Sequence, residues 1–368
     1  MIGVGVIGTG FGRTVHIPAF LAARGARVVG VASSRYERAR AVAAELSVPR
    51  CFPLWQEMLA CPEIQAVSIA TPPALHAEMT LAACGAGKAV LCEKPMALDA
   101  AQASEMLQAA RAAAIVHFVG FEFREIPALR FARELLRATE LGRLRHVNVT
   151  WIVHGWGDPS RQWSWRSDRS QGGGTLGALG VHVFDYLEWL LGPVRALAAR
   201  TATRIPHRPD PRGEMHPVTS EDCCDVLLEL CDGTPVSLAI SNVAPVGKGH
   251  WIELYGEKRS LTIGSDNLVD YGKGFRVWEG VPGTPQAREV PVPPGLQFDR
   301  EFSDGRIAPF ARLTQRFVDA IRQHDLHARP SFLDGHRAQV LLDAVRQAHS
   351  ARCWVEVPGG PGERNGEP

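Results

Sequence analysis

The first third of the chain alternates between two patterns of apolar residues. Residues 2 to 7 form a short, almost wholly apolar run, and after a group of glycines the apolar positions adopt helical spacing. The alternation repeats through residue 121, with later apolar runs "ARVVGVAS", "QAVSIAT", "KAVLCEKP" and "IVHFVGF". Short buried strands that alternate with helices are typical of a doubly wound parallel sheet. The pattern predicts a Rossmann-type α/β domain over residues 1–121.

The pattern changes after residue 121. Residues 143 to 153 alternate as a strand does, and "DVLLELCDGTPVSLAIS" predicts a hairpin that turns at "CDGT". "ARLTQRFVDAIRQ" and "DGHRAQVLLDAVRQAHSA" have helical spacing. We therefore expect an α+β domain over residues 122–357. The Pro/Gly-rich segments 205–220 and 280–295 are expected to be loops, and the tail 358–368 to be disordered.

Composition and charge narrow the class of protein. The 368 residues are 45% apolar and 21% charged, and 40 Lys and Arg against 39 Asp and Glu leave a net charge of +1. This balance argues against nucleic acid or an anionic membrane as a partner. The eight cysteines contain no CxxC pair and no metal-ligand spacing, and no apolar run reaches the roughly 18 residues of a membrane span. We expect a cytoplasmic enzyme or binding protein with reduced thiols and no metal.

The glycines after the first strand predict a dinucleotide site. In "IGVGVIGTGFGRTVH", Gly8 and Gly10 allow a sharp turn and bring bare backbone close to a pyrophosphate. Gly12 comes one position early, and Arg13 stands in the last slot of the GxGxxG fingerprint, so the match is imperfect. The residues expected to bind the cofactor are Gly8, Gly10, Phe11, Gly12, Ser33, Ser34, Arg35, Arg38, Thr71, Pro72, His76, Glu93 and Lys94.

The end of the second strand predicts which cofactor binds. An acidic residue there bonds the ribose hydroxyls of NAD, whereas small polar and basic residues accommodate the additional phosphate of NADP. The chain has "VASSRYERAR", with Ser33 in place of the acid and arginines after it. This favours NADP, with NAD possible. The alternative is that the arginines, Arg40 above all, form the solvated face of the next helix.

Two further segments carry residues able to do chemistry. Lys94 follows a strand in "CEKP", where it is either a solvated surface lysine or a proton donor or acceptor beside a nicotinamide. In "RQWSWRSDRSQ", Trp165 is expected to stack on a sugar ring and Arg166 to bond hydroxyls or a carboxylate. The alternative for this segment is a loop anchored by buried tryptophans.

The motifs taken together resemble one known family. "GTGFGRTVHIPAF", "ATPPALH", "CEKP", "GFEFR", "GGGTLGALGVHVFD", "SED" and "IELYGEKRSLTI", in this order, resemble the Gfo/Idh/MocA oxidoreductases from residue 2 to about 264. The resemblance implies a Rossmann domain and a second domain whose mostly antiparallel sheet is open on one face. It implies a sugar, polyol or related substrate beside the nicotinamide, with Lys94 and His182 as the catalytic residues. Packing of the open faces predicts a homodimer or homotetramer.

The chain departs from this family at two positions. Many members carry an aspartate four residues before the histidine, where this chain has Ala178. Asp185 either orients the His182 ring or bonds backbone or solvent. Members often have a polar amide where this chain has Glu122, which either replaces the missing carboxylate or pairs with Arg124. The alternatives to a dehydrogenase are a non-catalytic cofactor- or sugar-binding regulator and a glycosidase that uses tightly held NAD in a transient oxidation.

Overall fold

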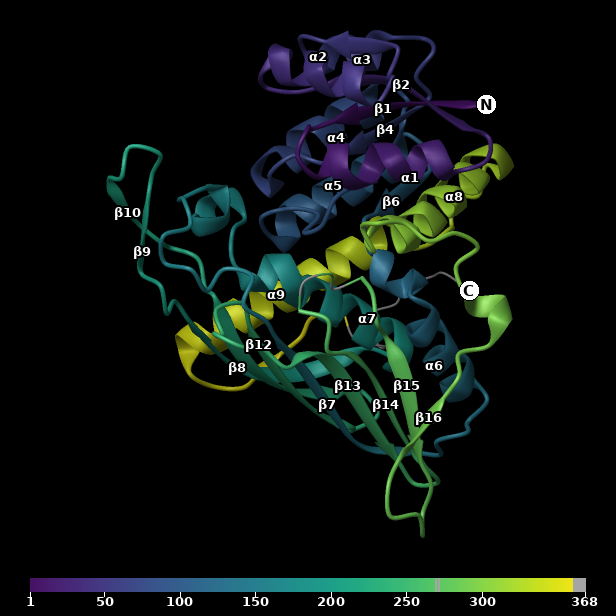
Figure 1. Ribbon diagram of the computed structural model, residues 1–368, viewed down its shortest axis with the longest axis vertical. Coiled ribbons are helices and arrows are strands. Elements are labelled where there is room, and N and C mark those ends of the chain that lie inside the picture. Colours follow the sequence, from purple (N-terminus) through teal and green to yellow (C-terminus); the bar gives the residue numbers. More distant parts are fainter. Residues whose placement is uncertain (269, 271, 360–368) are drawn as a thin grey trace. The chain divides into compact units, whose positions relative to one another are not determined.

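The chain forms two compact units in a computed structural model that describes residues 1–268, 270 and 272–359 (Figure 1). The first unit contains Met1–Glu122 and Arg300–Gln339, and the second contains Phe123–Asp299 and the residues from Val340 on. The tail predicted to be disordered lies outside the described residues from 360 on. Among the described residues, no helix combines the length and apolar character that a membrane crossing requires.

The first unit is built on a six-stranded parallel sheet in the order β3-β2-β1-β4-β5-β6 (Figure 1). Its strands are β1 Ile2–Ile7, β2 Ala26–Ala32, β3 Arg50–Phe52, β4 Ala66–Ile69, β5 Ala89–Cys92 and β6 His117–Val119. The helices that follow the first five strands are α1 Ile17–Ala22, α2 Tyr36–Glu45, α3 Trp55–Ala60, α4 His76–Gly85 and α5 Ala100–Ala112. The strands β4, β5 and β6 are buried throughout, because helices cover both faces of a parallel sheet of this kind. The predicted doubly wound sheet is confirmed.

A helix from far along the chain completes the core of this unit. Helix α8, Ile307–Gln323, buries Phe310, Leu313, Phe317 and Val318 in the same cluster as residues of β1 and α1. The Phe317 ring lies 6.4 Å from that of Phe20 and 5.4 Å from that of Phe118. Residues 300–339 were predicted as part of the second domain. The structure places them in the first unit, since the apolar face of α8 packs on α1 rather than on the second sheet.

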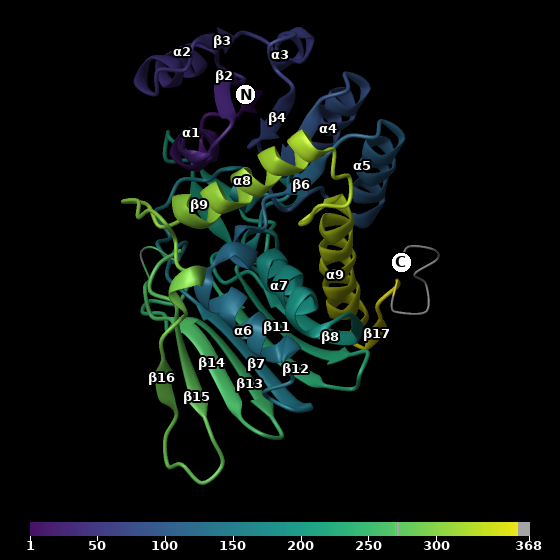
Figure 2. The ribbon, with the colours of Figure 1, turned by 90° about the vertical axis from the view of Figure 1, so that its right-hand side faces the viewer.

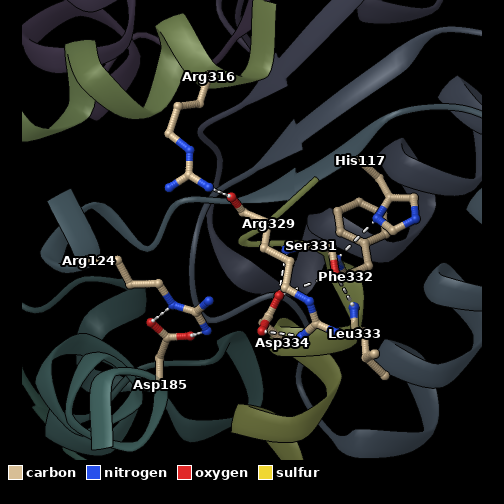
Figure 3. Close-up of polar contacts among 9 residues, drawn as sticks. All are labelled: His117, Arg124, Asp185, Arg316, Arg329, Ser331, Phe332, Leu333 and Asp334. Carbon is tan, nitrogen blue, oxygen red and sulfur yellow. Dashed lines mark hydrogen bonds and ion pairs between the residues drawn. The ribbon is translucent and has the colours of Figure 1, made fainter. Parts of the chain in front are cut away.

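The segment after α8 is tied to the end of β6. The Val119 amide donates to the Pro330 carbonyl at 3.1 Å, and the Phe332 amide donates to His117 Nδ1 at 3.1 Å (Figure 3). Burial lowers the pKa of His117 to about 4, so this nitrogen is a lone-pair acceptor at neutral pH. Asp334 accepts from the Ser331 amide at 2.7 Å and fixes the start of helix α9, Phe332–Ala351.

The second unit is built on a nine-stranded sheet in the order β16-β15-β14-β13-β7-β12-β11-β8-β17. Its strands are β7 Leu144–Ile152, β8 Val194–Ala202, β11 Cys223–Leu230, β12 Pro235–Ser241, β13 Gly249–Gly256, β14 Ser260–Ser265, β15 Arg276–Gly280, β16 Arg288–Val290 and β17 Val355–Glu356. The pairing of β12 with β7 is parallel and the other pairings are antiparallel. The predicted mostly antiparallel sheet is confirmed.

Two segments predicted to be loops contain short strands. Residues 205–220 hold the hairpin of β9, His207–Pro209, and β10, Met215–Pro217, and residues 280–295 hold β16. Each of these strands has three residues, too few to show a period of two. Prolines at the ends of β9 and β10 hid the hairpin further, because proline ordinarily breaks a strand pattern.

The two faces of the second sheet differ. Helices α6, Pro127–Arg137, and α7, Val181–Leu191, lie against one face (Figure 2). The other face presents the alternate residues, among them Asn148, Asp225 and Leu227, and Leu227 is 53% exposed. A groove on this open face is bordered by His349 and Trp354 from the end of the chain.

Candidate functional site

The three glycines after β1 differ in what an added side chain would meet. Gly8 has φ +117°, and a Cβ there would lie 2.4 Å from the Ala70 carbonyl oxygen, so only glycine fits this turn. A Cβ on Gly10 would meet nothing within 4 Å, which leaves bare backbone facing open space. A Cβ on Gly12 would lie 3.1 Å from Val6 Cγ1, because the helix approaches the strand closely. Turn, open backbone and close packing are the three roles of a dinucleotide fingerprint.

The early position of the third glycine coincides with a π-helical turn. Residues Gly12–His16 form this turn, in which the Ile17 amide donates to the Gly12 carbonyl, and α1 continues from there. Arg13, in the last slot of the fingerprint, points to the surface and pairs with Glu45 at 2.7 Å. The residues present therefore fit a dinucleotide pyrophosphate despite the imperfect motif.

The residues predicted to select the cofactor lie at the end of β2. Ser33 is half-buried with its hydroxyl 3.2 Å from that of Thr9 in the glycine turn, while Ser34, Arg35 and Arg38 are exposed. Arg40 pairs with Glu37 at 3.2 Å on the solvent side of α2. Arg40 therefore lies on the solvated face of α2, as the alternative for these arginines held.

His76 joins two loops at the carboxyl edge of the sheet. Its ring is fully buried, with Nδ1 3.0 Å from the Pro95 carbonyl oxygen and Nε2 2.9 Å from that of Thr71. Burial lowers the pKa of this imidazole. The ring links the segment that contains Thr71 and Pro72 to the turn after Lys94. Thr71, Pro72 and Lys94 therefore lie at the same edge of the sheet.

Glu93 and Lys94 follow β5 directly. Glu93 Oε2 accepts from the Lys94 amide at 3.2 Å, and Glu93 Oε1 lies 3.1 Å from His16 Nε2. His16 Nδ1 in turn lies 2.7 Å from the Ser68 hydroxyl, and the His16 ring has no exposed surface. Sequence reasoning missed His16. A polar residue among the buried Val15, Ile17 and Phe20 was the available signal.

Glu122 is a buried carboxyl beside these groups. Burial, and after it the charge of Glu93, raise its pKa to about 8, while Lys94 and Arg306 act in the opposite direction. It is 2% exposed. A carboxyl with this pKa is largely protonated at neutral pH and can donate a proton. Glu122 follows β6 and lies at the same edge of the sheet as Lys94.

The glycine run before α7 makes room for a buried carboxylate. Gly174 has φ +112°, and a Cβ there would lie 2.2 Å from Glu221 Oε1. That oxygen accepts from the Leu176 amide at 2.9 Å, at the start of a π-helical turn over Leu176–Gly180. Burial raises the pKa of Glu221. The glycines are therefore a close-packed support for the helix that carries His182, with Ala178 in the π turn.

His182 lies among aromatic rings on the covered face of the second sheet. Its ring centroid is 4.6 Å from that of Phe123 and 6.4 Å from that of Trp151, and the residue is 1% exposed. One helical turn later the Tyr186 hydroxyl is 2.9 Å from His250 Nε2, whose ring stacks on Trp151 at 4.0 Å. Burial lowers the pKa of His250 to about 3, so the ring is neutral at physiological pH. Sequence reasoning missed this pair.

Asp185 forms a buried ion pair with Arg124. Its two oxygens lie 2.9 and 2.6 Å from the guanidinium Nε and Nη2 (Figure 3). From the sequence, Asp185 was expected either to orient His182 or to bond backbone or solvent, and Glu122 either to replace the missing carboxylate or to pair with Arg124. The pairing of Arg124 with Asp185 was not among these alternatives, and it anchors α7 to the start of the second unit. Arg124 belongs to the 3₁₀ turn Glu122–Glu125, which ends just before α6.

The Trp165 segment supports the glycine run. The Arg166 guanidinium stacks 4.5 Å from the Trp165 ring centroid, and its backbone carbonyl accepts from the Gly174 amide at 3.2 Å. Both side chains are at least partly exposed. A recess beside them is also lined by Arg161 and Arg208, which lie in aperiodic sequence and were not predicted. Arg208 donates to the Trp156 and Asp158 carbonyls at 2.5 and 2.7 Å.

One group of potential metal ligands comes together on the β9–β10 hairpin. Atoms of Asp210, Glu214 and His216 lie within 4.8 Å of one another. Asp210 Oδ1 also accepts from the Arg212 and Glu214 amides at 2.8 and 2.9 Å, as expected of a turn-forming aspartate. The cluster is explained by the hairpin turn and receives no metal assignment.

Sequence comparisons relate both parts of the chain to known oxidoreductases. Residues 2–121 match the oxidoreductase family with NAD-binding Rossmann fold, and residues 133–357 match the C-terminal alpha/beta domain of that family. The chain is 43% identical over 357 residues to an uncharacterized oxidoreductase of Synechocystis sp., covering 96% of each chain. It is 28% identical to levoglucosan dehydrogenase of Pseudarthrobacter phenanthrenivorans, covering 97% of this chain and 98% of the relative.

Solved structures agree with these relatives. A levoglucosan dehydrogenase in complex with NADH and L-sorbose superposes with a TM-score of 0.89 at 26% identity, covering 97% of this chain and 99% of the other. A glycine turn on a parallel sheet, followed by a unit with a mostly antiparallel sheet, defines an NAD-binding oxidoreductase. The chain belongs to the Gfo/Idh/MocA family of these enzymes, and the predicted class of dehydrogenase or reductase is confirmed.

The glycine turn yields a paired test. Gly8→Ala should destabilise the protein by roughly 1–3 kcal/mol, because it strains the backbone and meets the Ala70 carbonyl. Gly10→Ala should change the stability by less than about 0.5 kcal/mol but weaken nicotinamide cofactor binding, since its methyl group occupies the space left for the pyrophosphate. Denaturant unfolding and calorimetric titration measure the two effects. Unchanged cofactor affinity in Gly10→Ala would contradict the assignment of the pyrophosphate site.

Proposed function

We propose that the protein is an NADP-preferring dehydrogenase or reductase of a sugar, polyol or related small carbonyl or hydroxyl compound. Residues 1–121 would bind the cofactor, and residues 122–357 would bind the substrate and a second copy of the chain. The observation that carries the proposal is the position of Lys94 after β5, on the sheet edge that also holds the open backbone of Gly10. Ligands of open α/β sheets bind at the carboxyl ends of the strands.

Lys94 and His182 are the proposed proton carriers. The bound nicotinamide would supply hydride transfer to or from the substrate carbon. Lys94 or His182 would give a proton to the carbonyl oxygen during reduction, or take it from the hydroxyl during oxidation. The rings of Phe123 and Trp151 exclude water from His182 and limit its rotation, which favours one fixed geometry for proton transfer. The roles of Glu122 and Asp185 are to assist, as a buried acid and as the anchor of α7.

The substrate class follows from the Trp165 segment and from the named relatives. The Trp165 ring with Arg166 stacked on it offers an apolar face and hydrogen-bond donors, a combination that suits a sugar ring. Levoglucosan dehydrogenase and a glucose-6-phosphate 3-dehydrogenase of Bacillus subtilis, 26% identical over 92% of this chain, are both named for sugars. We infer a sugar or polyol on these grounds.

The proposed NADP preference depends on the end of β2. Ser33 bears no charge that would repel a 2′-phosphate, and the exposed Arg35 and Arg38 can pair with one. Solved levoglucosan dehydrogenase complexes contain NADH, which makes NAD the competing cofactor to test.

The cysteines support a reducing compartment. All eight are free thiols, and Cys353 is exposed. Free exposed thiols persist in the cytoplasm, where disulfides are rare. We propose a cytoplasmic location for this reason.

The catalytic assignment predicts the effect of three substitutions. Lys94→Ala and His182→Ala should each lower kcat about 100-fold or more, the scale expected for the loss of a positioned acid or base. Cofactor binding should change little in His182→Ala, because the glycine turn and Lys94 are untouched. Ala178→Asp should raise the activity or shift its pH optimum by adding a carboxylate near the imidazole. Steady-state assays with a panel of sugars and polyols, followed by nicotinamide absorbance, measure these effects.

The alternative functions are separated by the same assays. If Lys94→Ala and His182→Ala both turn over a verified substrate at the rate of the unmodified protein, the catalytic assignment is wrong. Cofactor that stays bound through purification, with sugar cleavage and no net turnover of free NADP, would indicate the glycosidase. Binding of cofactor and sugar without reaction would indicate the regulator.

The cofactor preference has its own test. NADPH should bind more tightly than NADH, and Ser33→Asp should shift the ratio of dissociation constants toward NADH by about tenfold or more, since the new carboxylate repels the phosphate. Arg40→Ala is the control and should leave the ratio unchanged, because Arg40 pairs with Glu37. Titration of the tryptophan fluorescence gives both constants. Equal or tighter NADH binding by the unmodified protein would refute the preference.

The open sheet face predicts assembly. We propose that two copies pack these faces together, because a monomer would expose Leu227 and its apolar neighbours. Leu227→Asp should convert the dimer or tetramer into smaller species by burying a charge in the interface. Val246→Asp, at a position 84% exposed in a loop, is the control. Light scattering at micromolar concentration reports the mass, and a monomeric unmodified protein would rule the proposal out.

A further inference from the structure

A continuous chain of polar groups runs through the interior of the first unit to the Lys94 backbone. It starts at the Ser68 hydroxyl on β4, passes through the His16 ring and the Glu93 carboxylate, and ends at the Lys94 amide. Successive donor to acceptor distances are 2.7, 3.1 and 3.2 Å. Burying an imidazole and a carboxylate is costly, so a structure that keeps them buried must satisfy them with partners.

The direction of these hydrogen bonds depends on which nitrogen of the His16 ring carries the proton. A neutral imidazole has one N–H, and if Ser68 donates to Nδ1, that proton lies on Nε2 and is donated to Glu93. The carboxylate then accepts from the imidazole on one oxygen and from the Lys94 amide on the other.

The surroundings fix the two side chains in place. The His16 ring lies 4.3 Å from the Phe310 ring of α8 and 5.4 Å from the Phe11 ring of the glycine turn. On the other side of the chain, a Cβ on Gly120 would lie 2.6 Å from Glu93 Oε1. Three segments far apart in the sequence therefore enclose these groups and restrict the positions that the Glu93 side chain can occupy.

We propose that His16 and Glu93 are positioning residues for Lys94. They hold the backbone of the reactive lysine at the end of β5 and maintain a fixed negative charge beside it. The inference rests on the proposed role of Lys94 as proton carrier. Neither residue needs to touch the substrate, since both act through the lysine and the charge near it.

The charge on Glu93 also acts on Glu122. The groups that bear on the Glu122 carboxyl are Glu93, Lys94 and Arg306, and the charge of Glu93 opposes its ionisation. Burial first, and the charge of Glu93 after it, therefore keep Glu122 largely protonated at neutral pH. Loss of the Glu93 charge should make Glu122 ionise at lower pH.

The first experiment compares two substitutions of His16 in the full-length protein. His16→Leu removes the donor to Glu93 and should lower kcat about 10- to 100-fold, because a small displacement of a catalytic group costs this much. His16→Gln retains an N–H donor and should recover most of the loss. KM and the cofactor dissociation constant should stay within about twofold in both variants. Equal loss in His16→Gln and His16→Leu, or no loss in His16→Leu, would overturn the proposal.

The second experiment does not depend on turnover. Glu122 has its pKa raised from about 4.5 to about 8 in the folded protein. Between those values the folded state binds one more proton than the unfolded state, so the unfolding free energy must fall as pH rises. Glu122→Gln lacks this decline, and its difference from the unmodified protein isolates the Glu122 contribution. Denaturant unfolding across the pH range measures it.

The Glu93→Gln variant then tests whether the charge of Glu93 raises the pKa of Glu122. The contribution of Glu122 to the fall in unfolding free energy is the difference between Glu93→Gln and Glu93→Gln/Glu122→Gln. This fall should end at a pH lower by about one unit or more than in the unmodified protein, because the charge that raises the pKa is gone. If this fall covers the same pH range in Glu93→Gln, the inference is overturned even if the enzyme is active. If the pH range shifts but the protein turns over no sugar or polyol, the charge coupling stands and the proposed function is refuted instead.

Discussion

A carboxylate taken out of water is tolerated only where donors surround it, and this constraint governs the segments that would do chemistry. Glu93 is held by a histidine 77 residues away, and Asp185 is held by an arginine 61 residues away. Glu221 receives an amide 45 residues away. Each pairing joins a motif to a distant part of the same unit. The position of Lys94 and of the His182 helix therefore depends on these buried charges as much as on the sheets beneath them.

Glycines occur beside two of these carboxylates for a steric reason. Gly120 lies against Glu93, and Gly174 lies against Glu221, where an added Cβ would come within 2.6 and 2.2 Å of an oxygen. A side chain at either position would push the carboxylate away from its donors. The glycine run before α7 is thus explained by the acid it accommodates, 47 residues later in the chain, rather than by flexibility.

Much of the fold could be predicted from periodicity, because strands and helices bury their apolar residues with periods that a sequence displays. The parallel sheet, the hairpin of β11 and β12 and the helices α8 and α9 followed from such patterns. Periodicity does not say what an apolar face will meet, so it gave no sign that α8 packs in the core of the first unit. In the candidate site, motifs pointed to Lys94 and His182. The partners of Glu93 and Asp185 were beyond reach, because a pairing across 60 or more residues has no local pattern.

Helix α8 also bears on how the chain is made. The core of the first unit includes Phe310, Phe317 and Val318, which a ribosome supplies only after the whole β-sheet of the second unit up to β16 has been synthesised. Until then α1 and Phe118 on β6 lack the part of their apolar contacts that α8 provides. The first unit therefore cannot complete its core until residues of α8, more than 180 positions after β6, have been synthesised. A nascent chain would expose the apolar surface that α8 later covers for most of translation, and such surface is prone to aggregation.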